Sequence, residues 1–192
     1  MSSAHSSIGR LLRLVSFGLP GLAALAFSAP AAADFPVPQD LTLAVSHGER
    51  AGIKKIELDA GWMQAQPLWQ GQQWRLRLRH EVVLGQWHVP QARNITEFGY
   101  SPVLRLERPV GNSTLFAEAS IGVRLLSHFR LSPDITMSTA FQFADMIGAG
   151  VQFGNGPGAQ TIGLRFQHQS NANIKRPNPG INFVMAYYRY AF

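Results

Sequence analysis

A histidine and a serine stand two residues apart in the segment Thr161–Ser170, where apolar and polar side chains alternate. In a β-strand every second residue lies on the same face. The face that carries Leu164 and Phe166 therefore also carries His168 and Ser170. Polar groups on an apolar face are costly unless they are satisfied, so this placement points to function.

The chemistry that such a pair can perform is ester hydrolysis. A serine hydroxyl attacks a carbonyl carbon when a neighbouring base takes its proton, and histidine is the usual base. Residues two apart on one strand face have origins roughly 6.5–7 Å apart, within reach of a Ser–His hydrogen bond. Ser170 is thus the candidate nucleophile and His168 the candidate base. The alternative is an interfacial histidine beside an unrelated serine.

A histidine base needs a third group to fix its orientation, and two residues qualify. Asn182 shares strand parity with Val184, and a hairpin centred near Lys175 places it beside His168. An asparagine can accept the imidazole N–H and fix the tautomer, as it does in Cys-His-Asn hydrolases.

Asp145 is the second candidate for this role. A tight turn centred on Gly156–Pro157 places Asp145 opposite His168 on the preceding strand, with its side chain on the apolar face. The alternative is a bulge near Gly148 that turns the carboxylate away from this face.

The elements that position these residues are strands, because the period of the chain from about residue 41 onward is two. Seven turn signals divide the chain into eight segments, which predicts an all-β, eight-stranded antiparallel up-and-down barrel. The turns are expected at Gly48–Gly52, Pro67–Gly71, Pro90–Asn94, Pro109–Ser113, Ser132–Asp134, Asn155–Gly158 and Lys175–Gly180.

The distribution of charge favours a transmembrane barrel over a soluble one with an apolar interior. The polar faces are rich in arginine with interspersed glutamate, as expected of a small barrel with a charged lumen. The segment Tyr188–Phe192 resembles the C-terminal assembly signal of bacterial outer-membrane proteins. The tryptophans Trp62, Trp69, Trp74 and Trp87 are predicted to lie in interfacial girdles.

The N-terminal segment and the composition point to export. Residues 1–33 combine basic Arg10 and Arg13, an apolar run and an ending in three alanines, which predicts a cleaved signal peptide. Residues 34–192 then form the outer-membrane barrel. The chain has no cysteine, and its net charge of +6 is too small and scattered to suggest nucleic-acid binding.

Three segments of the chain resemble the lipid A 3-O-deacylase (PagL) family: Phe141–Asp145, Phe166–Ala172 and Pro177–Ile181. The resemblance implies an eight-stranded barrel of the bacterial outer membrane that hydrolyses the ester-linked acyl chain at the 3-position of lipid A in lipopolysaccharide. It also implies a catalytic Ser–His pair on the outer surface of the barrel, and no cofactor or metal ion.

The sequence departs from the family at one position. Where the family has a glutamate after Asn-x-Gly-Ile, this chain has Asn182, which cannot place a full negative charge beside an imidazolium. Asn171 is a candidate oxyanion donor or, alternatively, a turn former. Lys175 and Arg176 are candidate contacts to lipid A phosphates or, alternatively, solvated loop residues.

Other functions stay open at this point. A non-enzymatic outer-membrane barrel with a decayed site, such as an adhesin or integrity protein, would explain the alternation. It would not explain His168 and Ser170 facing lipid. A phospholipase or acyltransferase would use similar residues. The sequence also does not decide between a monomer and a homodimer.

Overall fold

The computed structural model describes residues 37–50 and 52–192, so the predicted signal peptide and its cleavage site lie outside the described residues. The strands are β1 (Asp40–Gly48), β2 (Lys54–Met63), β3 (Trp69–Gln70), β4 (Arg75–His88), β5 (Ile95–Val110), β6 (Ser113–Leu126), β7 (Phe141–Phe153), β8 (Gln160–Ser170) and β9 (Ile181–Ala191). None of the described residues forms a helix long and apolar enough to cross a membrane.

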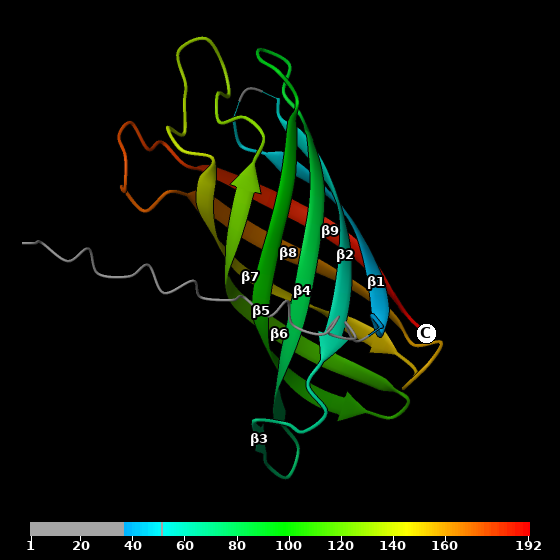
Figure 1. Ribbon diagram of the computed structural model, residues 1–192. Coiled ribbons are helices and arrows are strands. Elements are labelled where there is room, and N and C mark those ends of the chain that lie inside the picture. The colour runs from blue at the N-terminus through cyan, green and yellow to red at the C-terminus, as the bar shows by residue number, and fades with distance from the viewer. Residues whose placement is uncertain (1–36, 51) are drawn as a thin grey trace, which may run out of the picture. The chain divides into compact units, whose positions relative to one another are not determined.

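Eight of these strands form a closed antiparallel barrel (Figure 1). Each long strand pairs with its neighbours in the chain, β1 pairs with β9, and β2 pairs with β4. The two-residue strand β3 only adds to the beginning of β4. All seven predicted turns fall at connections between barrel strands, so the predicted eight-stranded up-and-down barrel is confirmed.

The barrel has an apolar outside and a charged inside. Ile121 and Val184, on the outer face, keep 68% and 62% of their surface exposed. Arg105 and Glu97, on the inner face, are fully buried. Because strand neighbours point to opposite faces, the period of two in the sequence produces this inversion, which suits a hydrocarbon environment.

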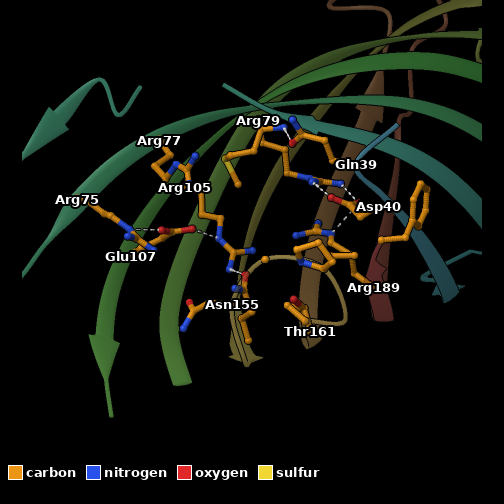
Figure 2. Close-up of a pocket in the computed structure, with 17 residues that line it drawn as sticks. Gln39, Asp40, Arg75, Arg77, Arg79, Arg105, Glu107, Asn155, Thr161 and Arg189 are labelled. Atoms are coloured by element: carbon orange, nitrogen blue, oxygen red, sulfur yellow. Dashed lines mark hydrogen bonds and ion pairs between the residues drawn. The ribbon is translucent and has the colours of Figure 1, made fainter. Parts of the chain in front are cut away.

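Glu81 is the centre of the charged interior. Its Oε1 accepts hydrogen bonds from Arg79 at 2.8 Å, from Arg165 at 2.8 Å and from Arg189 at 2.9 Å. Towards the end of the barrel that holds the C-terminus, the lumen opens into a cavity of about 420 Å³ lined by further arginines and by Asp40 and Glu107 (Figure 2). Buried charges are tolerated only when paired, and this network pairs them.

The opposite end of the lumen is apolar, whereas the sequence predicted a charged lumen. A buried cluster there combines strand residues with Leu131 and Met137 of the β6–β7 loop. Trp87 belongs to this cluster and donates its Nε1 hydrogen to Glu97 at 2.6 Å. The girdle position predicted for Trp87 is therefore wrong, whereas Trp69 and Trp74 are exposed.

The topology also orients the barrel. In bacterial outer-membrane barrels of even strand number both termini lie on the periplasmic side. β9 ends at Ala191 on that side, so β8, which runs antiparallel to β9, ends at the outer side. The loops 127–140 and 171–180 therefore belong to the outer end (Figure 1).

We expect Glu81→Gln to lower the free energy of unfolding of the barrel by about 3 kcal/mol, because three buried guanidinium groups lose their shared anion. Denaturant unfolding of detergent-refolded protein, followed by gel mobility without heating, measures the change. Asp134→Asn, which removes an exposed loop carboxylate, is the matched control. Equal midpoints for both variants would contradict this role of Glu81.

Candidate active site

The candidate site is a row of side chains across neighbouring strands at the outer end of the barrel. Asp145 of β7 pairs with His168 of β8, and His168 pairs with Asn182 of β9. Both pairings are those the sequence predicted. His168, Ser170 and Asn182 are half-buried on the outer face, and Asp145 is exposed there.

Asn182, and not Asp145, holds the imidazole. The His168 Nδ1 and Asn182 Oδ1 atoms are 2.7 Å apart in a hydrogen bond. Asp145 faces outward from a regular β7, so the alternative of a bulge that turns it away is wrong. Among the described residues, however, no hydrogen bond or ion pair joins Asp145 to His168. An amide oxygen only accepts, so this hydrogen bond requires a proton on His168 Nδ1, and Nε2 is the ring atom left to act as a base.

Glu49, which sequence reasoning missed, completes the row on the other side of Asn182. Asn182 Nδ2 donates to Glu49 Oε2 at 2.8 Å, and the Glu49 backbone N–H donates to the Asn182 carbonyl at 2.9 Å. Glu49 follows directly on β1, whose last pair with β9 joins Gly48 to Phe183. The predicted barrel could have revealed this contact. Closing an up-and-down barrel pairs its first and last strands, and that pairing brings residue 49 beside residue 182.

Gly180 makes room for the imidazole. A Cβ atom at this position would lie 2.7 Å from His168 Cε1 and 3.2 Å from Nε2, and the backbone φ is +61°. Glycine is needed for both reasons. The β8–β9 ladder ends with the pair of Gln169 and Ile181, and Gly180 lies one residue beyond it, as does Ser170. The edge of the imidazole that carries Nε2 therefore lies on the side of the ring nearer to Ser170 along the strands.

The Ser170 hydroxyl lies beside a backbone donor. Its Oγ accepts a long hydrogen bond of 3.5 Å from the Ala172 N–H, and within the described chain no hydrogen bond joins it to His168. Catalytic hydrogen bonds are often absent or long before substrate binds. Ala172 and Asn173 both have positive φ, 51° and 63°, which is uncommon for residues other than glycine and turns the chain sharply after the serine.

The role expected for Asn171 as an oxyanion donor requires correction. Its side chain is fully buried, and its Nδ2 donates to the carbonyls of Met137 and Lys175, each at 2.8 Å. Its backbone N–H donates to Asn178 Oδ1 at 3.1 Å. All its donors are therefore engaged, and Asn171 instead fixes the β8–β9 loop to the apolar cluster at the outer end of the lumen.

Lys175 and Arg176 lie in the same loop, exposed at the outer end of the barrel. The Lys175 carbonyl accepts a hydrogen bond from the Asn171 side chain. The position of both cations is compatible with the predicted contact to phosphate groups, which stays a prediction.

An apolar groove of about 760 Å³ runs across the outer face and ends at the site. Its walls come from five strands and include Leu78, Pro102, Leu104, Ile121, Ile147 and Phe166, with Asp145 and His168 at its polar end. The register places Ala119 between Leu104 and Ile147. Because Ala119 has a much smaller side chain than its neighbours, the surface is hollowed at this point.

Fold and site together define a class of protein: an outer-membrane β-barrel whose candidate active site faces the surrounding lipid rather than the lumen. Among the described residues, no three His, Asp or Glu side chains cluster in a way that could hold a metal ion. Residues 54–191 match the family model described as Lipid A 3-O-deacylase (PagL). The chain belongs to this family.

Similar proteins agree with this assignment. The chain is 30% identical over 151 residues to Lipid A deacylase PagL of Pseudomonas aeruginosa, an alignment that covers 78% of this chain and 84% of that protein. It is 33% identical over 118 residues to Lipid A deacylase PagL of Bordetella bronchiseptica, covering 62% and 64% respectively. A crystal structure of the outer membrane enzyme PagL superimposes with a TM-score of 0.71 at 29% identity, covering 80% of this chain and 99% of that one.

The geometry predicts that Asn182, rather than Asp145, orients the histidine. Asn182→Ala should lower kcat on purified lipid A by roughly 10- to 1,000-fold, below the roughly 10⁴-fold loss that follows alteration of the orienting residue in a serine protease triad. Asp145→Asn should change kcat far less, because Asp145 makes no hydrogen bond to His168. A severe loss in Asp145→Asn together with near-normal turnover in Asn182→Ala would reverse the assignment.

Proposed function

We propose that this protein removes the ester-linked acyl chain at the 3-position of lipid A by serine-type hydrolysis, with Ser170 as nucleophile and His168 as general base. The observation that carries the proposal is the His168–Asn182 hydrogen bond on a lipid-facing strand surface, two residues from a serine. It fixes the tautomer in which Nε2 can accept a proton. Family membership supports the substrate class.

The first half of the reaction forms an acyl-enzyme. Ser170 Oγ bonds to the ester carbonyl carbon while its proton passes to His168 Nε2. The carbonyl oxygen becomes an oxyanion, and the Ala172 N–H, which already lies beside the hydroxyl, is the donor we assign to it. When the bond between the carbonyl carbon and the sugar oxygen breaks, His168 returns the proton to that oxygen.

The second half restores the enzyme. A water molecule bonds to the acyl carbon and gives its proton to His168, and the Ser170 ester bond then breaks as the proton returns to Oγ. The products are a free fatty acid and lipid A with a free 3-hydroxyl group. Every bond that forms or breaks involves only the substrate, the serine, the histidine and water, and the Ala172 N–H stabilises the oxyanion, so the mechanism requires no cofactor.

The groove supports a substrate that stays in the membrane. An acyl chain lying across the row of Leu104, Ile147 and Phe166 would bring its ester group to His168. The groove surface already faces lipid, so an acyl chain gains little by hydrophobic transfer into it. Selection among chains then depends on shape and van der Waals packing. Lys175 and Arg176, at the outer end, would meet the phosphate groups of lipid A.

A non-enzymatic barrel is less well supported by the same contacts. A decayed site would no longer require a polar row on the lipid face, where unpaired polar groups are costly. Here His168 has a partner in Asn182, and Asn182 has one in Glu49. The glutamate expected at residue 182 is absent, but hydrogen bonds connect His168 through Asn182 to Glu49.

Two variants, Ser170→Ala and His168→Ala, test the proposed nucleophile and base. Each should lower the rate of hydrolysis of purified lipid A in detergent by at least about 10³-fold, because nucleophile and base act as a unit. Both variants should still fold into heat-modifiable barrels, since neither side chain contributes to the interior ion pairs. Release of fatty acid, measured by mass spectrometry, gives the rate. Turnover close to that of the wild type in either variant would rule out the mechanism.

A further inference from the structure

Glu49 is held against Asn182 from two sides. Its backbone N–H donates to the Asn182 carbonyl, while its carboxylate accepts from Asn182 Nδ2 at 2.8 Å and from the Asn182 backbone N–H at 3.3 Å. The backbone contact continues the β1–β9 ladder one residue beyond its last pair, and the two carboxylate contacts are made from that position. The carboxylate is therefore placed by the closure of the barrel rather than by a free loop.

These contacts decide which way the Asn182 amide faces. The amide N–H₂ group must face the carboxylate, since only nitrogen can donate to it. The amide oxygen is then left for His168 Nδ1, at 2.7 Å. Without Glu49 the amide could rotate by 180° and present a donor to the imidazole, which would favour the wrong tautomer.

The carboxylate also places a negative charge behind the amide. When His168 accepts the serine proton, its imidazolium is stabilised by the polarised Asn182 amide and, through it, by Glu49. Hydrogen bonds in a connected chain polarise one another. Arg50 lies 3.5 Å from the Glu49 carboxylate and donates to the Pro179 carbonyl at 3.4 Å, so it helps to hold Glu49 beside the β8–β9 loop.

We propose that Glu49 is a positioning residue for the hydrolysis, which acts through Asn182 on His168. Its carboxylate, hydrogen-bonded to Asn182, supplies the negative charge that the Asn182 side chain lacks. This inference rests on the proposed function, because its role is to orient and stabilise the catalytic base. The relay runs from the end of β1 through β9 to β8.

The decisive experiment is a double-mutant cycle on kcat for lipid A. In the wild-type background, Glu49→Gln keeps the shape but removes the charge, and it should lower kcat about tenfold with KM changed less than about twofold. In the Asn182→Glu background two carboxylates stand side by side, which is unfavourable. There Glu49→Gln should raise kcat severalfold, because its amide can donate to the carboxylate that contacts His168.

Asp134→Asn is the matched control, since it removes an exposed carboxylate of the β6–β7 loop at the same end of the barrel and should leave kcat unchanged in both backgrounds. If Glu49 acts through residue 182, the effect of Glu49→Gln on kcat must change sign between the two backgrounds. A loss of equal size in both backgrounds would mean that Glu49 only supports the loop, and no loss in either background would remove it from the mechanism.

A second measurement does not depend on turnover. Nitrogen-15 NMR of histidine-labelled protein should find His168, assigned by its absence in His168→Ala, protonated on Nδ1 in the wild type. Glu49→Ala should produce a mixture of tautomers, and Asp134→Asn should not. An unchanged tautomer in Glu49→Ala would overturn the positioning role. If the wild type shows this tautomer yet does not hydrolyse lipid A, the proposed function fails while the positioning role stands.

Discussion

The barrel depends on the pairing of the charged side chains that its closed sheet buries in the lumen. Three guanidinium groups share the Glu81 carboxylate, and buried ions of this kind are tolerated only because each has a partner. With the charges gathered in the lumen, the outer face can be apolar. The polar row of Asp145, His168 and Asn182 lies outside this charged interior, on the lipid-facing side of the barrel, where unpaired polar groups are costly.

The same closure builds the site. β1 and β9 are the first and last strands in sequence, and only their pairing brings Glu49 to Asn182. The β8–β9 loop that carries the turn after Ser170 is fixed in turn by Asn171, whose side chain reaches the β6–β7 loop at Met137. A Ser138–Pro177 hydrogen bond of 2.7 Å joins the two loops again. Residues distant in sequence thus hold the histidine and the serine through backbone and amide contacts.

The sequence predicts the parts of this architecture that are local. The period of two and the turn signals define the strands, and the tight turn at Gly156–Pro157 is enough to place Asp145 opposite His168.

What the sequence could not supply depends on long-range packing. The buried position of Trp87 needs the apolar cluster that fills the outer end of the lumen. Asn171 looked like a free donor because its acceptors, Met137 and Lys175, come together only when the loops fold. The pairing of Asp145 or Asn182 with His168 could not be decided by parity, since both lie on the same face.

The absence of a glutamate at residue 182 therefore does not leave the histidine without support. The Asn182 amide occupies that position and is hydrogen-bonded to His168, and the Glu49 carboxylate is hydrogen-bonded to the other side of the amide. We propose that Ser170 and His168, whose imidazole is hydrogen-bonded to Asn182 on the lipid-facing surface, act on lipid A within the outer leaflet. Mass spectrometry of lipid A from cells that produce the protein, compared with cells that produce Ser170→Ala at equal levels, tests this directly. We predict that the wild type yields lipid A that lacks the acyl chain at the 3-position, whereas Ser170→Ala leaves it intact. Intact lipid A in cells whose outer membrane holds folded wild-type protein would contradict the account.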